Sequence, residues 1–182
     1  SGGAVGSDSQ WGMTAGLLGH SVIHWSFDGH NAQVPDNEIV VLSEEQLSHA
    51  DIPLENARKY LGRTPHPDGY IKNLLRRNWY QVQYTERVYA VSSITDKATD
   101  GGTGYAVAMF LQRFNLQPCE CYVYDQFLQE WLMWNKKWVP IDMPPEPYGV
   151  WAGIGTRKLN NSGKLAIRKL MNYFPDPSID SK

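Results

Sequence analysis

The sequence predicts an α/β fold built around a mostly parallel sheet. Short stretches rich in β-branched and aromatic residues alternate with longer stretches whose apolar residues recur at helical spacing. One stretch, 87–94 (RVYAVSSI), is almost continuously apolar, which is typical of a strand covered on both faces. Right-handed crossovers place the strand-to-helix loops of such a sheet at one edge, so we expect any ligand there.

The first half of the chain opens on a glycine-rich turn, SGGAVGSD, with no strand before it. Because such a turn normally follows a strand or helix, we expect a short strand upstream of residue 1. Ser7 or Asp8 is the expected N-cap of the helix that follows. The remaining expected elements are helix 8–19, strand 21–27, strand 38–43, a helix capped by Ser43, a helix from Pro53 and a long helix over 67–83.

The second half continues the alternation of strands and helices. Its expected elements are strand 87–94, helix 105–115, strand 119–125, a hairpin over 129–141 with its turn at 135–137, strand 149–157 and a last helix capped by Asn161 or Ser162. No repeat, linker or low-complexity stretch interrupts the pattern. We therefore expect a single domain over residues 1–182.

The composition is that of an ordinary globular domain. With 182 residues, 42% of them hydrophobic, the chain can bury a core without a disulfide or a metal. It contains neither an apolar run of about 18 residues nor a signal peptide, so we expect a cytoplasmic protein with no membrane association. Cys119 and Cys121 lack a second Cys/His pair, which predicts buried free thiols, no metal site and no cofactor.

The charges are unevenly distributed along the chain. All 17 Lys and Arg residues lie after residue 57, whereas the first 57 residues carry eight acidic ones. The basic residues nevertheless form no tract, and non-specific nucleic-acid binding usually needs a clustered basic face. We therefore do not expect direct nucleic-acid binding.

Three glycine-rich turns precede helices: Gly2-Gly3-Ala4-Val5-Gly6, Gly101-Gly102-Thr103-Gly104 and Gly153-Ile154-Gly155-Thr156. Glycine allows the backbone to approach a ligand, and a helix start offers unpaired N–H groups. One such turn is often purely structural, but three at one sheet edge favour a site for a phosphorylated ligand. None matches the P-loop or the dinucleotide fingerprint, so kinase, ATPase and ordinary dehydrogenase functions lose their main support.

These stretches also carry a resemblance to a known superfamily. The turn SGGAVGSD with its helix, the run RVYAVSSI followed by GGTGYAVAMFLQ, and CYVYDQ together resemble the SLOG superfamily, which includes the LOG phosphoribohydrolases and the Smf/DprA proteins. The later stretch AGIGTRKLNNSGKLAIRKL is similar to a further glycine turn of some members. The resemblance covers most of the chain, with 28–70 matched only loosely. It implies a Rossmann-like three-layer sandwich that binds a nucleotide or nucleotide-derived ligand.

The resemblance assigns roles to the glycine turns. It implies that a phosphate is held by Gly101, Gly102, Thr103 and Gly104, with help from the first turn and its neighbours Gly2, Gly3, Ala4, Gly6 and Ser7. LOG enzymes carry P-G-G-x-G-T-x-x-E, whose Glu serves N-glycosidic bond cleavage. In this chain Asp100 replaces the Pro, Tyr105 the Thr and Ala108 the Glu. The phosphate cradle is therefore expected to be kept while that catalytic acid is absent.

If the protein is a hydrolase, another carboxylate must act. Asp8, after the first turn, and Asp125, at a strand end, are the candidate catalytic acids. The structural alternatives are a helix cap for Asp8 and a loop hydrogen bond for Asp125.

Several further residues are candidate ligand contacts. Ser26 and His30 lie at a strand end, Arg77 lies on the long helix, and Thr156 and Arg157 follow Gly155 in the third turn. An arginine can bind a phosphate through two parallel hydrogen bonds. The tryptophans of the hairpin could stack on a base, but we expect them to pack on the sheet edge or form an interface.

The sequence thus predicts a protein that binds a nucleotide or nucleotide-derived ligand as a sensor, carrier or sequestering protein. The alternative is an N-glycoside hydrolase acting on a nucleoside monophosphate or NAD-like substrate. A third possibility, single-stranded DNA binding, is weakened by the lack of a basic cluster. Because SLOG relatives are often dimers or tetramers, the resemblance also implies a homo-oligomer.

Overall fold

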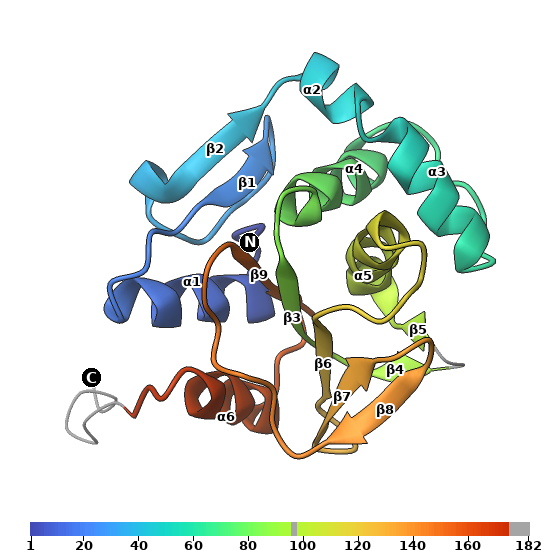
Figure 1. The fold of residues 1–182 in the computed structure, drawn as a ribbon. Coiled ribbons are helices and arrows are strands. Elements are labelled where there is room, and N and C mark those ends of the chain that lie inside the picture. Colours follow the sequence, from blue (N-terminus) through green and yellow to red (C-terminus); the bar gives the residue numbers. More distant parts are fainter. Residues whose placement is uncertain (96–97, 175–182) are drawn as a thin grey trace.

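The central feature of the fold is a five-stranded sheet with the order β8-β7-β6-β3-β9 (Figure 1). The structure is a computed structural model, and it describes residues 1–95 and 98–174. β3 lies between β6 and β9 and is parallel to both, whereas β7 is antiparallel to β6 on one side and to β8 on the other. The strands are β3 (Arg87–Ser92), β6 (Cys121–Asp125), β7 (Glu130–Trp134), β8 (Trp138–Ile141) and β9 (Trp151–Gly155).

Two further pairs of strands lie outside this sheet. β1 (His24–Phe27) and β2 (Ile39–Leu42) pair with each other in parallel, and a short 3-10 helix, η1 (Asp36–Glu38), precedes β2. β4 (Ile94–Thr95) and β5 (Ala98–Thr99) form a small antiparallel pair before the second glycine turn. The α/β class is therefore confirmed, with a mixed central sheet whose parallel part is β6-β3-β9.

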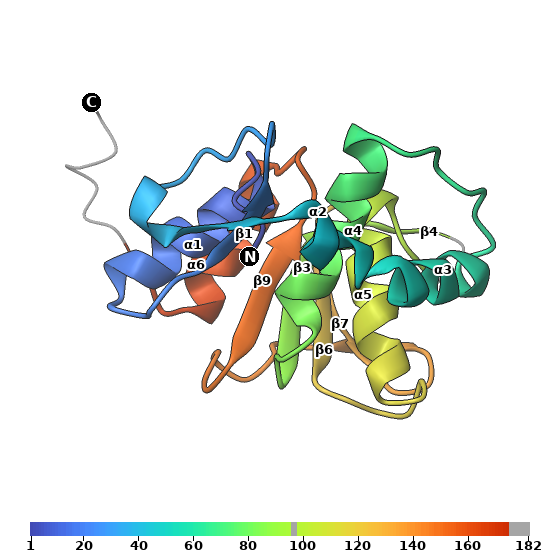
Figure 2. The ribbon, with the colours of Figure 1, turned by 90° about the horizontal axis from the view of Figure 1, so that it is seen from above.

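Helices cover both faces of the parallel part. Figure 1 shows α3, α4 and α5 on one side of the central sheet, and α1 and α6 on the other; Figure 2 gives the view from above. The helices are α1 (Ser7–Leu17), α2 (Glu44–Ser48), α3 (Asp51–Tyr60), α4 (Tyr70–Val82), α5 (Gly101–Arg113) and α6 (Asn161–Leu170).

β3 is buried along its whole length because its side chains alternate between two hydrophobic clusters. Val88 and Ala90 pack with α5, while Tyr89 and Val91 pack with residues of α1 and α6. Each fully buried aliphatic side chain of this kind contributes roughly 1.5–3 kcal/mol. The carboxyl ends of β3 and β9 are thereby held in fixed positions, where the candidate site lies.

The helix starts show where local sequence decides the structure and where it does not. Ser43 caps α2 with a full capping box, as predicted. The cap of α1 is Gly6 rather than Ser7 or Asp8, and the cap of α6 is Asn160 rather than Asn161 or Ser162. The predicted hairpin at 129–141 is confirmed as β7 and β8.

The second glycine turn differs from its prediction. Gly101-Gly102-Thr103-Gly104 forms the first turn of α5, which begins directly after Asp100 instead of at Tyr105. The Asp100 side chain accepts a hydrogen bond from Gly101 N at 2.7 Å, so it is an N-cap. A good cap and the apolar residues that follow outweigh the low helix propensity of glycine.

Within residues 1–95 and 98–174, no helix is both long enough and apolar enough to span a bilayer.

Candidate functional site

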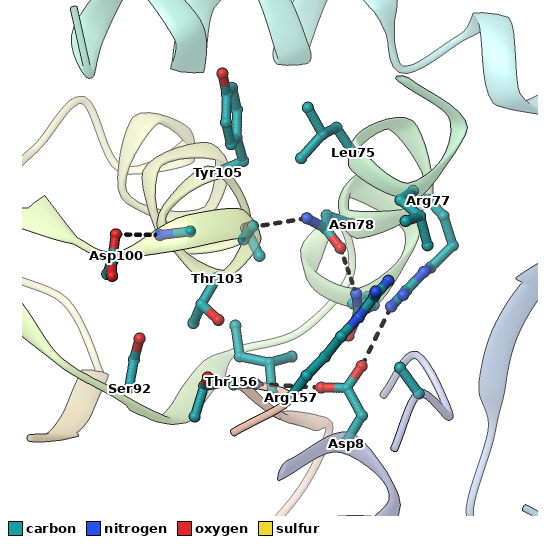
Figure 3. A pocket seen from close by; sticks show the side chains of 18 of the residues that line it. Asp8, Leu75, Arg77, Asn78, Ser92, Asp100, Thr103, Tyr105, Thr156 and Arg157 are labelled. Atoms are coloured by element: carbon teal, nitrogen blue, oxygen red, sulfur yellow. Dashed lines mark hydrogen bonds and ion pairs between the residues drawn. The ribbon is translucent and has the colours of Figure 1, made fainter. Parts of the chain in front are cut away.

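A cavity of about 680 Å³ lies at the carboxyl ends of β3 and β9 (Figure 3). Its walls come from parts of the chain that are distant in sequence, among them Asp8 at the start of α1, Arg77 and Asn78 on α4, Gly101 and Gly102 at the start of α5, and the loop 156–158 after β9. This is the sheet edge at which the sequence predicts a ligand. We call this hollow the edge cavity.

The start of α5 forms one wall of the edge cavity. A Cβ built on Gly101 meets nothing within 4 Å, and one built on Gly102 meets only Leu75 Cδ2 at 4.0 Å. Asn78 Nδ2 donates to Gly102 O at 3.0 Å and holds this turn against α4. The first turn of a helix offers unpaired N–H groups and a partial positive charge, so an anion can approach this backbone closely.

Gly104 lies on the other side of this turn and does not line the edge cavity. A Cβ there would lie 2.2 Å from Thr99 O and 2.9 Å from Arg63 Nη2. Gly104 is therefore glycine because α5 begins tight against β5. Thr103, in contrast, lines the edge cavity.

A buried ion pair crosses the edge cavity. Arg77 Nη1 lies 3.3 Å from Asp8 Oδ2, and Asp8 Oδ1 accepts a hydrogen bond from Gly155 N at 3.1 Å. Both residues are buried: Arg77 is 4% exposed and Asp8 is 6% exposed. Burial lowers the pKa of the Arg77 guanidinium, and the Asp8 carboxylate opposes that effect. The carboxylate thus joins α1, α4 and the end of β9.

The first glycine turn serves packing more than ligand contact. A Cβ on Gly2 would lie 1.4 Å from Arg77 Nη1, and one on Gly6 would lie 2.6 Å from Thr156 O. Gly3 has φ +65° and packs against Val34. Of the predicted residues of this turn, Ala4 lines the edge cavity, whereas Gly2, Gly3, Gly6 and Ser7 do not.

The third glycine turn supplies two basic side chains. Gly155, Thr156, Arg157 and Lys158 all line the edge cavity, and the last two are exposed. The start of α1 holds this turn in place, because both the backbone N and the Oγ of Ser7 donate to Thr156 O at 3.0 Å. In Figure 3 the Arg157 side chain extends toward Arg77.

The opposite end of the edge cavity is aromatic and apolar. It is lined by Leu75, Tyr105 and His66, and the Arg63 guanidinium lies 5.0 Å from the Tyr105 ring centroid. Arg63 also donates to Gly101 O at 2.6 Å. The sequence reasoning missed Arg63 and His66, because they stand in the loop between α3 and α4, which has no periodic pattern.

Three buried polar atoms around the edge cavity have no hydrogen-bond partner among the described residues: Arg77 Nε, Gln81 Oε1 and Tyr105 Oη. A buried polar group that lacks a partner costs roughly 1–3 kcal/mol. Such groups are rare in native proteins. Each of these three atoms is itself almost completely covered by protein, so they do not by themselves indicate a ligand.

The remaining candidates lie outside the lining. Ser26 Oγ and His30 Nδ1 are 2.9 Å apart and hydrogen-bond each other. Burial, with Arg77 and Arg157 nearby, lowers the pKa of His30 to about 4. Asp125 accepts backbone hydrogen bonds from Ile94, Phe127 and Leu128, so the structure gives it a loop-holding role.

Other features of the sequence have structural roles away from the edge cavity. Trp131 packs on Tyr124 and Trp134 packs on Trp138, each pair with ring centroids 5.2 Å apart. Ala108, which takes the place of the LOG glutamate, is buried on α5 and does not line the edge cavity. Cys119 and Cys121 are free thiols, half-buried and buried respectively. The described residues contain no cluster of His, Cys, Asp or Glu suited to a metal ion.

Comparisons with protein-family models, with curated proteins and with solved structures find no match for this chain. Inference about its function therefore depends on the geometry of the edge cavity.

Proposed function

We propose that the protein binds a phosphorylated ligand of nucleotide type in the edge cavity, as a sensor, carrier or sequestering protein. One observation carries this proposal. The first turn of α5 lines the same cavity of about 680 Å³ as the basic residues Arg77, Arg157 and Lys158. That volume lies within the range of small-molecule sites, about 300–1,000 Å³.

The phosphate would lie between the start of α5 and the loop after β9. The Gly101 N–H is already bound to the Asp100 carboxylate, so the N–H groups of Gly102 and Thr103 are the ones that would meet an anion, and Thr103 adds a hydroxyl. Arg157 and Lys158 are exposed and free of the buried ion pair that engages Arg77, so they can turn toward an incoming anion. Charge-assisted hydrogen bonds of this kind are roughly twice as strong as neutral ones.

The other end of the edge cavity suits a planar heterocycle. Tyr105, Leu75 and His66 supply an apolar and aromatic surface, and the polar residues Asn78 and Gln81 also line the edge cavity. A ligand with a phosphate at one end and a hydrogen-bonding ring at the other fits both halves.

N-glycoside hydrolysis is the second candidate, and Asp8 favours it because its carboxylate lines the edge cavity. Both Asp8 oxygens already accept hydrogen bonds, from Gly155 N and from Arg77. A carboxylate held in this way can stay ionised and stabilise the positive charge of an oxocarbenium-like transition state. Hydrolysis would then need a separate acid for the leaving base.

We further propose that the chain is a Rossmann-like member of the SLOG superfamily that forms a homo-oligomer in the cytoplasm. The parallel strands β6-β3-β9, with helices on both faces and the edge cavity at their carboxyl ends, support the fold assignment. The oligomeric state and the cytoplasmic location stay predictions.

The test is a calorimetric titration with a matched panel: a nucleoside monophosphate, its nucleoside, ribose 5-phosphate and inorganic phosphate. We expect the monophosphate to bind at least tenfold more tightly than the nucleoside and than inorganic phosphate. Equal affinity for nucleoside and monophosphate would contradict the phosphate site. Mass spectrometry of the same mixtures separates the two functions, since release of free base over many turnovers identifies a hydrolase.

A further inference from the structure

Three residues with hydroxyl groups line one end of the edge cavity, and each comes from a different element. Ser92 is the last residue of β3, Thr156 follows β9, and Thr103 lies in the first turn of α5. Thr156 N donates to Val91 O at 2.8 Å, so Ser92 and Thr156 stand on neighbouring chain segments where the two parallel strands end. In Figure 3 both lie on the side of the edge cavity away from Tyr105. We call Ser92, Thr103 and Thr156 the hydroxyl corner.

Two members of the hydroxyl corner are buried hydroxyls without a partner. Ser92 is 2% exposed and Thr103 is 8% exposed, and neither side chain forms a hydrogen bond with any residue in the described part of the chain. Unlike the enclosed atoms Arg77 Nε, Gln81 Oε1 and Tyr105 Oη, their oxygens open on the edge cavity. A buried hydroxyl without a partner destabilises the folded chain, and a ligand in the edge cavity can supply the partner.

The surrounding hydrogen bonds explain why these hydroxyls are left to donate. A threonine in a helix often donates to the carbonyl four residues earlier, which for Thr103 is Thr99 O. Arg63 Nη2 already donates to that carbonyl at 3.0 Å. The Thr156 hydroxyl accepts from Lys158 N at 3.1 Å, so its own proton stays available. The hydroxyl corner therefore presents O–H donors to whatever enters the edge cavity.

These donors add to the start of α5, where the N–H groups of Gly102 and Thr103 meet the same cavity. A terminal phosphate has three strong acceptor oxygens, and each can accept more than one hydrogen bond. A phosphodiester has only two such oxygens, and its phosphorus carries a second bulky substituent. Among donors as buried as Ser92 and Thr103, that substituent would take the place of an acceptor. The arrangement of donors thus suits the end of a phosphorylated chain.

The charges around the edge cavity act in the same direction. A terminal phosphate carries roughly −1.5 to −2 charges at pH 7, whereas a phosphodiester carries a single negative charge. Among the described residues, the cationic side chains that line the edge cavity outnumber the carboxylates; the cations are Arg63, Arg77, Arg157 and Lys158, and the carboxylates are Asp8 and Asp100. An excess of positive charge stabilises the more highly charged group more strongly.

We propose that Ser92 is a ligand-binding residue and that the hydroxyl corner holds the terminal phosphate of the ligand, so that the edge cavity accepts molecules that end in a phosphate and rejects cyclic and bridging phosphodiesters. This inference rests on the proposed function and narrows the class of ligand. Ser92 belongs to none of the three glycine turns. Its role follows from its burial and from its free hydroxyl at the end of β3.

The first test compares phosphate forms by calorimetry. The probes are the 5′-monophosphates of the four common ribonucleosides, their 3′,5′-cyclic monophosphates and the free nucleosides. We expect the tightest 5′-monophosphate to bind roughly tenfold more tightly than its cyclic form, which has the same base, the same sugar and one fewer free oxygen. If both forms bind equally and more tightly than the nucleoside, the terminal-phosphate assignment is wrong while the proposed function stands. If no phosphate form binds more tightly than its nucleoside, the proposed function fails and this inference fails with it.

The second test separates binding from folding. Ser92→Ala and Thr103→Val remove hydroxyls that have no partner in the protein, so Tm should stay the same or rise while affinity for the 5′-monophosphate falls about tenfold. Thr85→Val is the matched control, because Thr85 is also buried but lies outside the edge cavity, and its hydroxyl donates to Val82 O at 3.1 Å. That variant should lose stability and keep its affinity.

Unchanged affinity in Ser92→Ala would overturn the assignment of Ser92. A fall in Tm for Ser92→Ala as large as that for Thr85→Val would also overturn it, because the hydroxyl would then serve the fold. The affinity of Ser92→Ala for the free nucleoside provides the last check. It should match that of the parent protein, since the nucleoside has no group for the hydroxyl corner.

Discussion

Arg77 Nη1 lies 3.3 Å from Asp8 Oδ2, and this contact links α4 to the start of α1 across the edge cavity. The same carboxylate accepts a hydrogen bond from Gly155 N, so a single side chain joins three segments that meet at the sheet edge. Both partners of the ion pair are buried, which makes it sensitive to the loss of either charge.

Asp8→Asn is expected to lower the free energy of unfolding by about 3 kcal/mol, because it leaves the Arg77 guanidinium buried without a counter-charge. Urea denaturation at neutral pH measures the change. Asp28→Asn is the matched control, since Asp28 is exposed. In the double variant Asp8→Asn/Arg77→Leu part of the loss should be recovered; a loss equal to the sum of the single variants would contradict the coupling.

Gly102 and Gly104 are predicted to respond in opposite ways to alanine. Gly102→Ala keeps or raises stability by up to about 1 kcal/mol, because alanine is the better helix former and its Cβ meets only Leu75. The added methyl group narrows the approach to the α5 backbone, so nucleoside monophosphate affinity should fall about tenfold.

Gly104→Ala places a Cβ against Thr99 O and should cost about 1–3 kcal/mol of stability. Thermal denaturation and calorimetry of both variants decide; unchanged affinity in Gly102→Ala would remove α5 from the site.

Arg157→Ala and Lys158→Ala are each predicted to weaken binding of the monophosphate about tenfold, the effect of losing one charge-assisted hydrogen bond of ~1.5 kcal/mol. Stability should not change, since both side chains are exposed. Lys164→Ala, an exposed lysine of α6 outside the edge cavity, serves as the control. The affinity of the parent protein should also fall as salt rises, and a salt-independent affinity would argue against an anionic ligand.

His24 is predicted to make the fold less stable in mild acid. Burial lowers its pKa from 6.5 to about 4, so between these values the unfolded chain binds a proton that the folded chain does not. The contribution of His24 is complete above pH 6.5 and is lost as the pH falls toward 4, to the extent of about 3 kcal/mol. Urea denaturation at several pH values should show a flatter profile for His24→Gln, whereas exposed His49→Gln keeps the parent profile. Parallel profiles for the parent and His24→Gln would rule this out.

The strands of the central sheet could be predicted from sequence because their pattern is local. RVYAVSSI and CECYVYD are apolar runs of the right length, and Asn135-Lys136-Lys137 marks the hairpin turn. β7 runs antiparallel to its neighbours β6 and β8, which makes the sheet mixed, and β1 and β2 lie apart from it. Sheet membership depends on long-range pairing, which no local pattern encodes.

The candidate site was foreseen in its place and only in part in its residues. The sequence shows that Gly2 and Gly101 are glycines, but it cannot show what would occupy the space of a side chain. At Gly2 that space holds Arg77, whereas at Gly101 it is open to the edge cavity. Asp125 ends a strand as expected, yet three backbone N–H groups engage its carboxylate.

The hydrogen bonds that hold Thr156 affect the entropy of ligand binding. Ser7 donates two hydrogen bonds to Thr156 O, and Gly6 packs so closely that no β-carbon would fit. The backbone that carries Arg157 is therefore ordered when the chain folds, before any ligand arrives. The entropy lost in fixing this turn belongs to folding rather than to association, so the site is preorganised and only side-chain freedom remains to be lost on binding.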